Sequence, residues 1–329
     1  MLGRTNRRAF IAGLGGAVMW PLAAGAQQTK VWRVGYLSPA FPPDKSPSDA
    51  VVFEAFRGKM KDLGYVEGRN LIIEARYAEG RSDRLPALAN ELVSLPCDLI
   101  VAFATPAIAA AQRATSTIPI VMSPSTDPIG SGFIKSFAHP AGNITGVANL
   151  YGDMTAKTVE LLHAILPGAK EIAVLMSSNP THPPLYDVAR DAAQSLGLSA
   201  VPIRAPTPAD LEGAFEKMAD EKCDALFVLA DPMPPRTIVP LAAAHKLPSV
   251  YQISLFVEAG GMASYGANAE AMFAKAAQYV DKILKGANPA DLPVEQPTRF
   301  EFVLNLKTAK SLGISIPEAV ILRADKVIE

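Results

Sequence analysis

Two copies of one strand–helix pattern follow each other along most of the chain. Each copy alternates short runs rich in valine, isoleucine and leucine with alanine-rich amphipathic stretches. Such runs are typical of buried strands in a parallel sheet, and the amphipathic stretches are typical of helices. Because this alternation requires right-handed crossovers, each copy predicts a parallel sheet covered by helices on both faces. The predicted fold class is therefore α/β, with two doubly wound parallel-sheet lobes.

The hydrophobic pattern also places the individual elements. The first copy has expected strands at 31–38, 71–76, 97–103 and 118–121, and expected helices at 50–63, at 84–94 and from residue 106. The second has expected strands at 171–176, 198–203, 223–229 and 247–251, and expected helices at 185–196, at 208–220 and up to residue 245. A strand at 261–265, a helix at 269–285, an extended connection at 286–297, a strand at 300–304 and a terminal helix from residue 317 complete the prediction.

The two cysteines occupy equivalent positions in the two copies. Cys97 and Cys223 each precede an aspartate at the start of an expected strand. Equivalent positions in separate lobes lie far apart, whereas a disulfide requires α-carbons within about 7 Å. We therefore expect two unpaired, buried and inert thiols.

Residues 1–26 have the pattern of a cleavable export signal. Arg7 and Arg8 precede an apolar run from residue 11 to residue 24, and the small residues Ala24-Gly25-Ala26 follow. Paired arginines next to a large apolar residue favour a twin-arginine signal; an ordinary secretory signal is the alternative. Both alternatives predict export. No cysteine lies near the cleavage site, so lipid attachment there is not expected.

Charge and hydropathy exclude several classes of protein. Residues 1–26 carry three arginines and no acid, so the rest of the chain has a formal charge of −4, with 28 basic and 32 acidic side chains. A mildly acidic chain lacks the basic surface that nucleic acid requires. No stretch after the signal is apolar enough to span a bilayer. The remaining residues, roughly 300, suffice for two globular domains.

Short polar residues follow the expected strands of both copies. In open parallel sheets, ligands bind beyond the carboxyl ends of the strands. Hydroxyls and helix N-termini suit a small anion, whereas the carboxylates of Asp127 and Asp231 suit an ammonium group. A Ser, Thr or Asp before a helix is also a common N-cap, and tyrosines after strands commonly pack in the core. The candidate ligand-binding residues are Ser38, Thr105, Ser123, Thr126, Asp127, Ser178, Asn179, Asp231, Tyr251 and Tyr265.

Catalytic and metal-binding motifs are missing from the sequence. There is no G-x-S-x-G nucleophile elbow, no H-E-x-x-H and no P-loop, so we expect neither an enzyme nor a cofactor. The four histidines are scattered without metal-ligand spacing, so no metal site is expected. A hydrolase using Ser38 or Ser178 would need a histidine base that no motif supplies. His182, near Asn179, is the one histidine that we keep as a contact candidate.

The order of short motifs resembles one transport family, the ABC-transporter substrate-binding proteins of the tryptophan/tyrosine-transporter type. The resemblance covers nearly the whole chain after residue 26. Its carriers are Val-Gly-Tyr-Leu-Ser at 34–38, Leu-Gly-Tyr-Val-Glu-Gly at 63–68, Ala-Thr-Pro-Ala at 104–107, Thr-Asp-Pro-Ile-Gly at 126–130, Gly-Asn-Ile-Thr-Gly-Val at 142–147, Asp-Lys-Ile-Leu-Lys-Gly at 281–286, Pro-Ala-Asp-Leu-Pro-Val-Glu at 289–295 and Asn-Leu-Lys-Thr-Ala-Lys at 305–310.

This resemblance implies a type I periplasmic-binding-protein fold with three crossings, near residues 146, 266 and 291. The implied lobes are 27–146 plus 267–290, and 147–266 plus 291–329. Thr105, Thr126, Asp127, Asn179 and Asp231 match the family's ligand-contacting positions. Residues 230–235 are Ala-Asp-Pro-Met-Pro-Pro, where many relatives have Thr-Asp-Asn, so this chain lacks that side-chain amide.

The function implied is capture of a small organic solute between the lobes by hinge closure. The solute would be an amino acid, aromatic ones included, or a related carboxylate. The expected partners are an ABC permease and ATPase in the inner membrane, and not nucleic acid. We expect a monomer in the periplasm. A solute sensor that presents its closed form to a receptor is the alternative.

Overall fold

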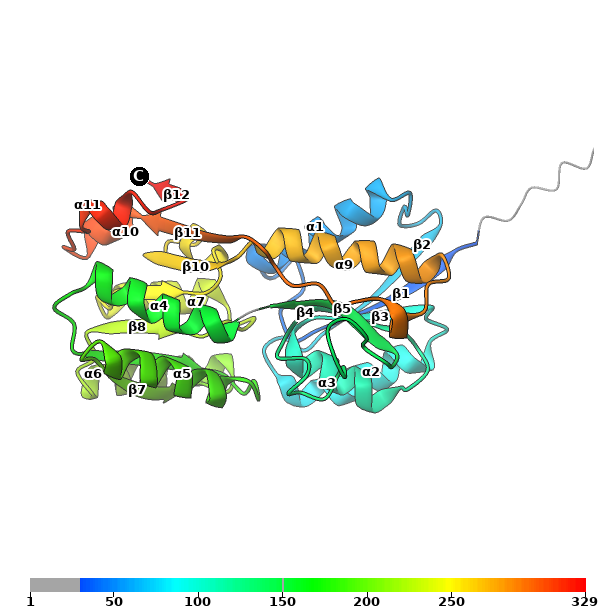
Figure 1. The fold of residues 1–329 in the computed structure, drawn as a ribbon, viewed down its shortest axis with the longest axis horizontal. Helices are drawn as coiled ribbons and strands as arrows, with labels where there is room; N and C mark the ends of the chain where they lie inside the picture. Colours follow the sequence, from blue (N-terminus) through cyan, green and yellow to red (C-terminus); the bar gives the residue numbers. More distant parts are fainter. Residues whose placement is uncertain (1–29, 150) are drawn as a thin grey trace, which may run out of the picture. The chain divides into compact units, whose positions relative to one another are not determined.

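The computed structural model describes residues 30–149 and 151–329. Residues from Val31 to Glu329 form one compact unit, which contains two lobes, each built on its own sheet (Figure 1). The predicted export signal lies outside the described residues.

The first lobe is built on a five-stranded parallel sheet in the order β2-β1-β3-β4-β5. Its strands are β1 (Trp32–Ser38), β2 (Leu71–Tyr77), β3 (Leu99–Ala102), β4 (Ile120–Thr126) and β5 (Ile144–Asn149). Its helices are α1 (Pro47–Asp62), α2 (Leu85–Ser94), α3 (Ala104–Ala114) and α9 (Ala269–Leu284), with short 3-10 turns at Ser82–Arg84 and Pro289–Asp291.

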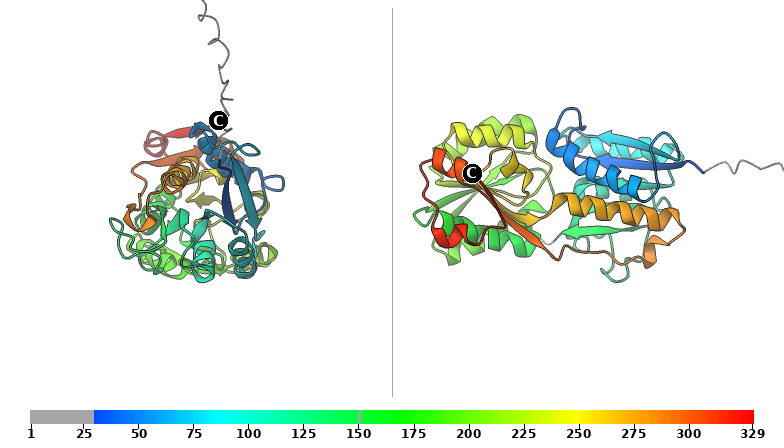
Figure 2. Two further views of the ribbon diagram at one scale, coloured as in Figure 1. Left: turned by 90° about the vertical axis from the view of Figure 1, so that its right-hand side faces the viewer. Right: turned by 90° about the horizontal axis from the view of Figure 1, so that it is seen from above.

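Alternate side chains of each first-lobe strand enter two different cores. Tyr36 packs with α1 and α9 on one face of the sheet, and its neighbour Leu37 packs with α2 and α3 on the other. The helices α1 and α9 lie side by side (Figure 2). A parallel sheet buried on both faces accounts for the continuous apolar runs in the sequence.

The second lobe repeats this order and then extends it. Its seven-stranded sheet has the order β12-β11-β10-β9-β8-β6-β7. Its strands are β6 (Glu171–Met176), β7 (Ser199–Arg204), β8 (Ala225–Val228), β9 (Ser249–Tyr251), β10 (Ala263–Ala267), β11 (Phe300–Asn305) and β12 (Lys326–Ile328). The run β7-β6-β8-β9-β10 matches β2-β1-β3-β4-β5 strand for strand, and β11 adds an antiparallel strand beside β10.

Helices cover both faces of the second sheet as well. Its helices are α4 (Tyr151–Ile165), α5 (His182–Ser195), α6 (Leu211–Asp220), α7 (Pro235–Ala244), α8 (Leu255–Glu258), α10 (Leu306–Ser311) and α11 (Glu318–Ile321), with a 3-10 turn at Pro208–Asp210. The cores place α4 and α5 on one face and α6, α7 and α8 on the other.

The aspartates of the two Cys-Asp segments form equivalent hydrogen bonds in the two lobes. Asp98 Oδ2 accepts a hydrogen bond of 2.8 Å from the Arg33 backbone N–H at the start of β1. Asp224 Oδ2 accepts hydrogen bonds of 2.7 and 3.0 Å from Lys170 N–H and Glu171 N–H at the start of β6. These bonds lower the pKa of Asp224. Each aspartate thus satisfies the backbone where the central strand begins.

The cysteines are free, as predicted, and they lie in different lobes. Both side chains are only partly buried, so the expectation of buried thiols was wrong. Partial burial still raises the pKa of the Cys97 thiol, and it raises that of Cys223 to about 11. Neither thiol is activated as a nucleophile.

The chain passes between the lobes in three places. The first passage follows Asn149, because β5 continues to that residue beside Ser125 and Thr126 of β4. The second is at Asn268, between β10 and α9. The third lies between Glu295, which bridges to Val147, and the start of β11. The predicted crossings near 146, 266 and 291 each lie a few residues earlier in the chain.

Several elements differ from the sequence prediction, including the short helices α8 and α10, which were not predicted. The strand β5 and the helix α4 were not predicted as elements. The predicted terminal helix is one short turn, α11, followed by the edge strand β12, which pairs parallel to β11.

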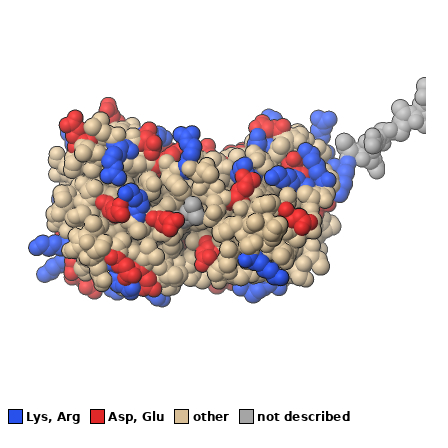
Figure 3. Space-filling view, viewed as in Figure 1, with Lys and Arg blue, Asp and Glu red and all other residues tan. Residues whose placement is uncertain are grey.

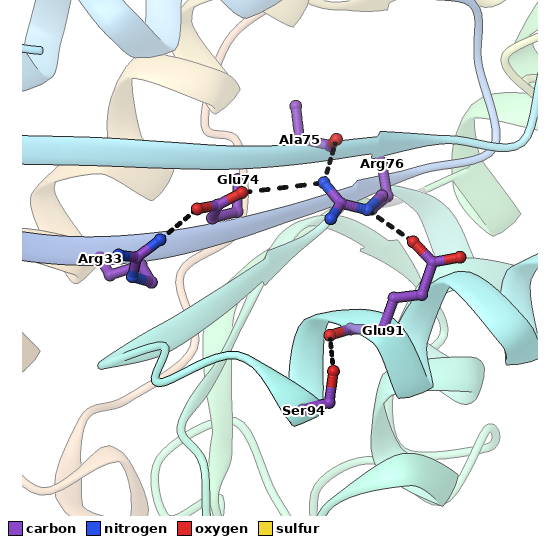
Figure 4. A network of polar contacts seen from close by, with 6 residues as sticks. All are labelled: Arg33, Glu74, Ala75, Arg76, Glu91 and Ser94. Carbon is purple, nitrogen blue, oxygen red and sulfur yellow. Dashed lines mark hydrogen bonds and ion pairs between the residues drawn. The ribbon is translucent and has the colours of Figure 1, made fainter.

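A surface network ties β1, β2 and α2 together (Figure 4). Glu74 on β2 lies between Arg33 of β1 and Arg76, and Arg76 Nε is 2.8 Å from Glu91 Oε2 on α2. The ion pairs of this surface network contribute little to stability, about 0–1 kcal/mol each.

On the face shown in Figure 3, charges of both signs are interspersed and no basic tract is visible.

Gly266 allows β10 to approach the end of β9. A Cβ at Gly266 would lie 1.9 Å from the Gln252 carbonyl oxygen, which is backbone and has no room to move. We expect Gly266→Ala to destabilise the protein by about 1–3 kcal/mol in urea denaturation. The control is Gly58→Ala in α1, where a Cβ meets nothing within 4 Å; it should stabilise by up to about 1 kcal/mol. Equal stability of the two variants would contradict this account.

Candidate functional site

The carboxyl ends of both sheets meet at a cleft that residues of both lobes line. The largest cavity there has a volume of about 640 Å³. The first lobe contributes Thr105, Thr126, Asp127, Phe133, Phe137 and Asn149, and the second contributes Tyr151, Asp153, Thr181 and Leu185. We call this the large cavity. Its volume falls in the range of ordinary small-molecule sites, about 300–1,000 Å³.

Two threonines fix the first-lobe wall of the large cavity. Thr105 lies in the first turn of α3, and its hydroxyl pairs with both backbone groups of Thr126 at 3.3 Å. Both threonines are buried. The pairing joins the start of α3 to the end of β4, so the amides at the start of this helix are held at the cleft.

Asn149 presents an unpartnered oxygen at the same cavity. Its side chain is 6% exposed and lines the large cavity, yet its Oδ1 has no hydrogen-bond partner in the described part of the chain. A buried acceptor without a partner is unfavourable, because it has lost its hydration without replacement. This position is therefore suited to a donor supplied from outside the chain.

A smaller, largely apolar cavity lies on the other side of Tyr151, whose side chain lines both. It has a volume of about 50 Å³. We call it the small cavity. Its walls include aromatic and aliphatic side chains of both lobes: Val52, Phe103, Tyr151, Met233, Phe256, Met272 and Phe273. Its polar residues are Ser48 and Asp49 from α1 and Asp231 from the loop after β8.

Asp231 is held in place by the loop that follows β6. Ser177 Oγ donates a hydrogen bond of 2.5 Å to Asp231 Oδ2, and Asn179 Nδ2 donates one of 2.9 Å to Oδ1. The Asn179 Oδ1 in turn accepts from Thr181 N–H and from its hydroxyl. The two loops therefore form one unit that fixes the direction of the carboxylate.

The side chain of His182 holds together the two loops that fix Asp231. Its Nδ1 accepts from Ser177 N–H at 2.9 Å, so its Nε2 carries the hydrogen and faces the Ala230 carbonyl at 3.3 Å. Burial lowers the pKa of His182, and the negative charge of Asp231 opposes that shift only in part. The neutral imidazole is therefore a structural support, and its full burial removes it as a contact candidate.

Asp49 is a half-buried carboxylate of the first lobe. Its Oδ2 accepts a hydrogen bond of 3.2 Å from Phe41 N–H. Burial raises the pKa of Asp49 to about 6, although hydrogen bonds from Ser46 and Phe41 act in the opposite direction. Burial in low-dielectric surroundings disfavours the charged form.

The structure brings some of the ten predicted residues to the cleft. Thr105, Thr126 and Asp127 line the large cavity, and Asp231 lines the small one. Ser178 lines a narrow gap of about 20 Å³ between the lobes, where a Cβ at Gly80 would lie 2.6 Å from Pro208 Cγ. The lobes thus touch at this edge of the cleft.

The other predicted residues lie behind the cavity walls. Ser38 Oγ accepts from Ala40 N–H within its own turn, and Ser123 Oγ is buried without a partner in the described chain. Asn179 acts through Asp231, as described above.

Asp127, at the rim of the large cavity, has a local partner. Its Oδ1 accepts a hydrogen bond of 2.9 Å from Gly130 N–H, so the carboxylate caps its own turn.

The two predicted tyrosines are packing residues in this structure. Tyr251 is fully buried, stacks on Phe256 at 4.6 Å and donates to Ser249 Oγ. Tyr265 packs against the second-lobe core and Phe300. Neither lines the large cavity, the small cavity or the narrow gap, and their contact with a ligand stays a prediction.

Sequence reasoning missed Asp49, Tyr151 and Phe103. Asp49 lies in the first turn of a helix, where an acid has the ordinary explanation of a favourable helix dipole. Tyr151 opens the unpredicted helix α4 directly after the first passage between lobes. Phe103 follows β3, at the carboxyl end of a predicted strand, so the rule for parallel sheets could have found it.

Cations are missing from the lining of these cavities. No Lys or Arg of the described residues lines the large cavity, the small cavity or the narrow gap. Within 30–149 and 151–329, no group of His, Cys, Asp and Glu is arranged to hold a metal ion. The helices of the same ranges include none that is long and apolar enough to cross a membrane.

Comparison with known proteins shows the family. A model of the ABC transporter substrate binding protein family matches residues 46–328. The chain belongs to this family. It is therefore a solute-binding component of an ABC transporter, with the type I periplasmic-binding-protein fold.

Individual relatives cover most of this family member. It is 29% identical over 267 residues to the Tyrosine-binding protein of Clostridioides difficile, covering 79% of this chain and 76% of that protein. The structure of an ABC domain from Streptococcus pneumonia in complex with L-Trp is 29% identical and has a TM-score of 0.82, covering 91% of this chain and all of that one. A conserved domain protein from Vibrio cholerae is 30% identical with a TM-score of 0.83 over the same shares.

A ligand-free, open substrate-binding protein from Clostridium difficile is 25% identical but has a TM-score of only 0.61, covering 91% of this chain and 99% of that one. The L-Trp complex, at similar identity and coverage, thus superposes more closely on the present structure than the ligand-free, open protein does.

The buried imidazole of His182 predicts a pH-dependent stability. The pKa of His182 is lowered in the folded state, whereas in the unfolded chain it is about 6.5. Below that pH the unfolded chain binds more protons than the folded one, so the free energy of unfolding falls as the pH decreases. The contribution reaches at most about 1.4 kcal/mol per pH unit. His182→Gln should be less stable at pH 7.5 but lose less stability than the parent between pH 7 and pH 5.

The exposed His139 provides the control for this measurement. His139→Gln should keep the full pH dependence of unfolding by urea, because the side chain of His139 is exposed to solvent in the folded protein. If the two variants show the same dependence on pH, His182 does not fold as the neutral form.

Proposed function

We propose that this protein captures an amino acid with an aromatic or apolar side chain in the periplasm and delivers it to its membrane transporter. The observation that carries the proposal is the large cavity, which is lined by both lobes at the carboxyl ends of their sheets. A solute in this position contacts both lobes and stabilises the closed form over the open one. The protein itself performs no chemistry on the solute.

The lining of the cleft supports an amphipathic solute. Phe133, Phe137 and Tyr151 offer aromatic surface in the large cavity, and Thr105 with the start of α3 offers hydrogen-bond donors for a carboxylate. Asp231 offers a fixed acceptor for an ammonium group. The relatives add weight, since one is described as tyrosine-binding and another was solved with L-Trp.

The expected export signal and the family membership support the remaining parts of the proposal. Residues 1–26 would direct the chain out of the cytoplasm and be removed. The partners would be a permease and an ATPase subunit, with the closed monomer as the form that the permease recognises.

A thermal-shift screen tests the function. The purified protein would be heated with each of the common amino acids, aromatic acids, amines and sugars. At a hundredfold excess over Kd, a ligand stabilises the native state by about 2.7 kcal/mol. We expect an aromatic amino acid to raise the melting temperature by several degrees.

A variant separates the cleft from other binding sites. Leu185→Arg would place a large cation in the large cavity from a position that lines it at 6% exposure, and it should abolish the shift. The exposed Val188 also lines that cavity, at its rim, and Val188→Arg should have a smaller effect. No shift with any compound of the screen would contradict a solute-binding role.

A further inference from the structure

We infer that this cleft recognises its solute through a cationic ammonium group held between Asp49 and Asp231, and that a carboxylate on the solute is dispensable. The inference rests on the proposed function and names the class of solute: an amine with an apolar or aromatic body. An amino acid would be one member of that class.

The first support is the placement of the two acids. Asp49 comes from α1 of the first lobe and Asp231 from the loop after β8 of the second, and both line the small cavity. Neither forms an ion pair with a residue of 30–149 or 151–329. Two carboxylates, one from each lobe, therefore line one largely apolar cavity with no cation of the described chain to pair with them, although Ser177 and Asn179 donate hydrogen bonds to Asp231.

Such an arrangement is unfavourable without a cation. A buried charge is tolerated when it is paired, and two like charges at one site raise each other's proton affinity. The protein supplies no Lys or Arg to the lining of this cavity. An ammonium group from the solute would pair with both acids at once, so it would favour the closed form in which the acids face the same cavity.

The second support is independent of the acids. The unpartnered Oδ1 of Asn149, which is 6% exposed, lines the large cavity and can only accept a hydrogen bond. It therefore suits a donor of the solute, such as an indole or amine N–H. This buried acceptor favours a solute that offers a hydrogen-bond donor at this position.

The volumes assign a place to each part of the solute. The small cavity, at about 50 Å³, has room for about one or two water molecules and hence for an ammonium head. The large cavity, at about 640 Å³, has room for an aromatic body. Tyr151 lines both cavities, so the solute would extend along its ring.

Three matched indole compounds test the inference: tryptamine, L-tryptophan and indole-3-propionate. They share one ring and differ in whether they carry the ammonium, both charged groups, or the carboxylate alone. In titration calorimetry at pH 7.5, tryptamine should bind within about tenfold of L-tryptophan, and indole-3-propionate should bind at least about a hundredfold more weakly. Propionate binding as tight as that of tryptamine would overturn the inference.

Asp49→Asn identifies the first-lobe partner of the ammonium. It should weaken tryptamine binding by roughly ten- to a hundredfold, the effect of losing a hydrogen bond to a charged group. The matched control is Asp62→Asn at the other end of the same helix, which removes the same charge at an exposed position outside the cavities; it should leave the Kd within about twofold. Equal Kd values in both variants would overturn the role of Asp49.

A pH profile provides a test that needs no variant of the site. Binding of a cation requires the ionised form of Asp49, whose pKa in the free protein is raised to about 6 by burial. The affinity for tryptamine should therefore fall as the pH decreases from 7 to 5, and it should change less in Asp49→Asn. The groups that face Asp49 are Tyr36 and Tyr77, whose pKa values are raised further above neutrality, and Asp231. An affinity independent of pH in the parent would contradict the inference.

These outcomes are separable from failure of the proposed function. A thermal shift with a sugar or a simple acid, but with none of the amines, would leave the solute-binding role standing and overturn the ammonium site. No shift with any compound would overturn both.

Discussion

Both parallel sheets point their carboxyl ends at the same cleft, and the rest of the molecule follows from this constraint. The matching strand orders, β2-β1-β3-β4-β5 and β7-β6-β8-β9-β10, place the same kinds of loop on the two facing edges. In each sheet the chain adds its first strands on one side of the central strand and the later ones on the other, and this switch in strand order leaves a crevice beside the central strand. The two crevices face each other, so a solute is enclosed only when the lobes meet.

The repeat in the sequence predicted this arrangement of strands well, because the burial of both faces of each sheet requires it. Continuous apolar strands can only lie in a sheet covered on both faces, and the equivalent Cys-Asp segments showed which strands correspond. The structure supplies the reason for that equivalence, since Asp98 and Asp224 both accept hydrogen bonds from the backbone at the start of the central strand. Ser38 and Ser177 correspond in the same way, each accepting a hydrogen bond from the amide two residues later.

The site was harder to predict. The hydrophobic pattern of the sequence indicates which strands end at the cleft, but it does not indicate which side chains point into the cleft. Tyr251 follows a strand as expected, yet its ring packs on Phe256 in the core. Asp127 is directed to its own turn by Gly130 N–H. Asp49 is far from any strand end in sequence, and only the packing of α1 beside the cleft brings it to the small cavity. Each of these positions depends on tertiary packing, which no local pattern in the sequence indicates.

Closure and recognition are linked by the same charges. In an open cleft, water would solvate Asp49 and Asp231 and screen them from each other; in the closed cleft, apolar walls replace that water. The free protein therefore has an electrostatic reason to stay open, and a cationic solute removes it. The pKa of Asp49, raised to about 6, reflects the burial of its carboxylate in the unliganded structure. A protein that must release its solute to a transporter benefits from such a balance, because the closed form is favourable only while the solute is bound.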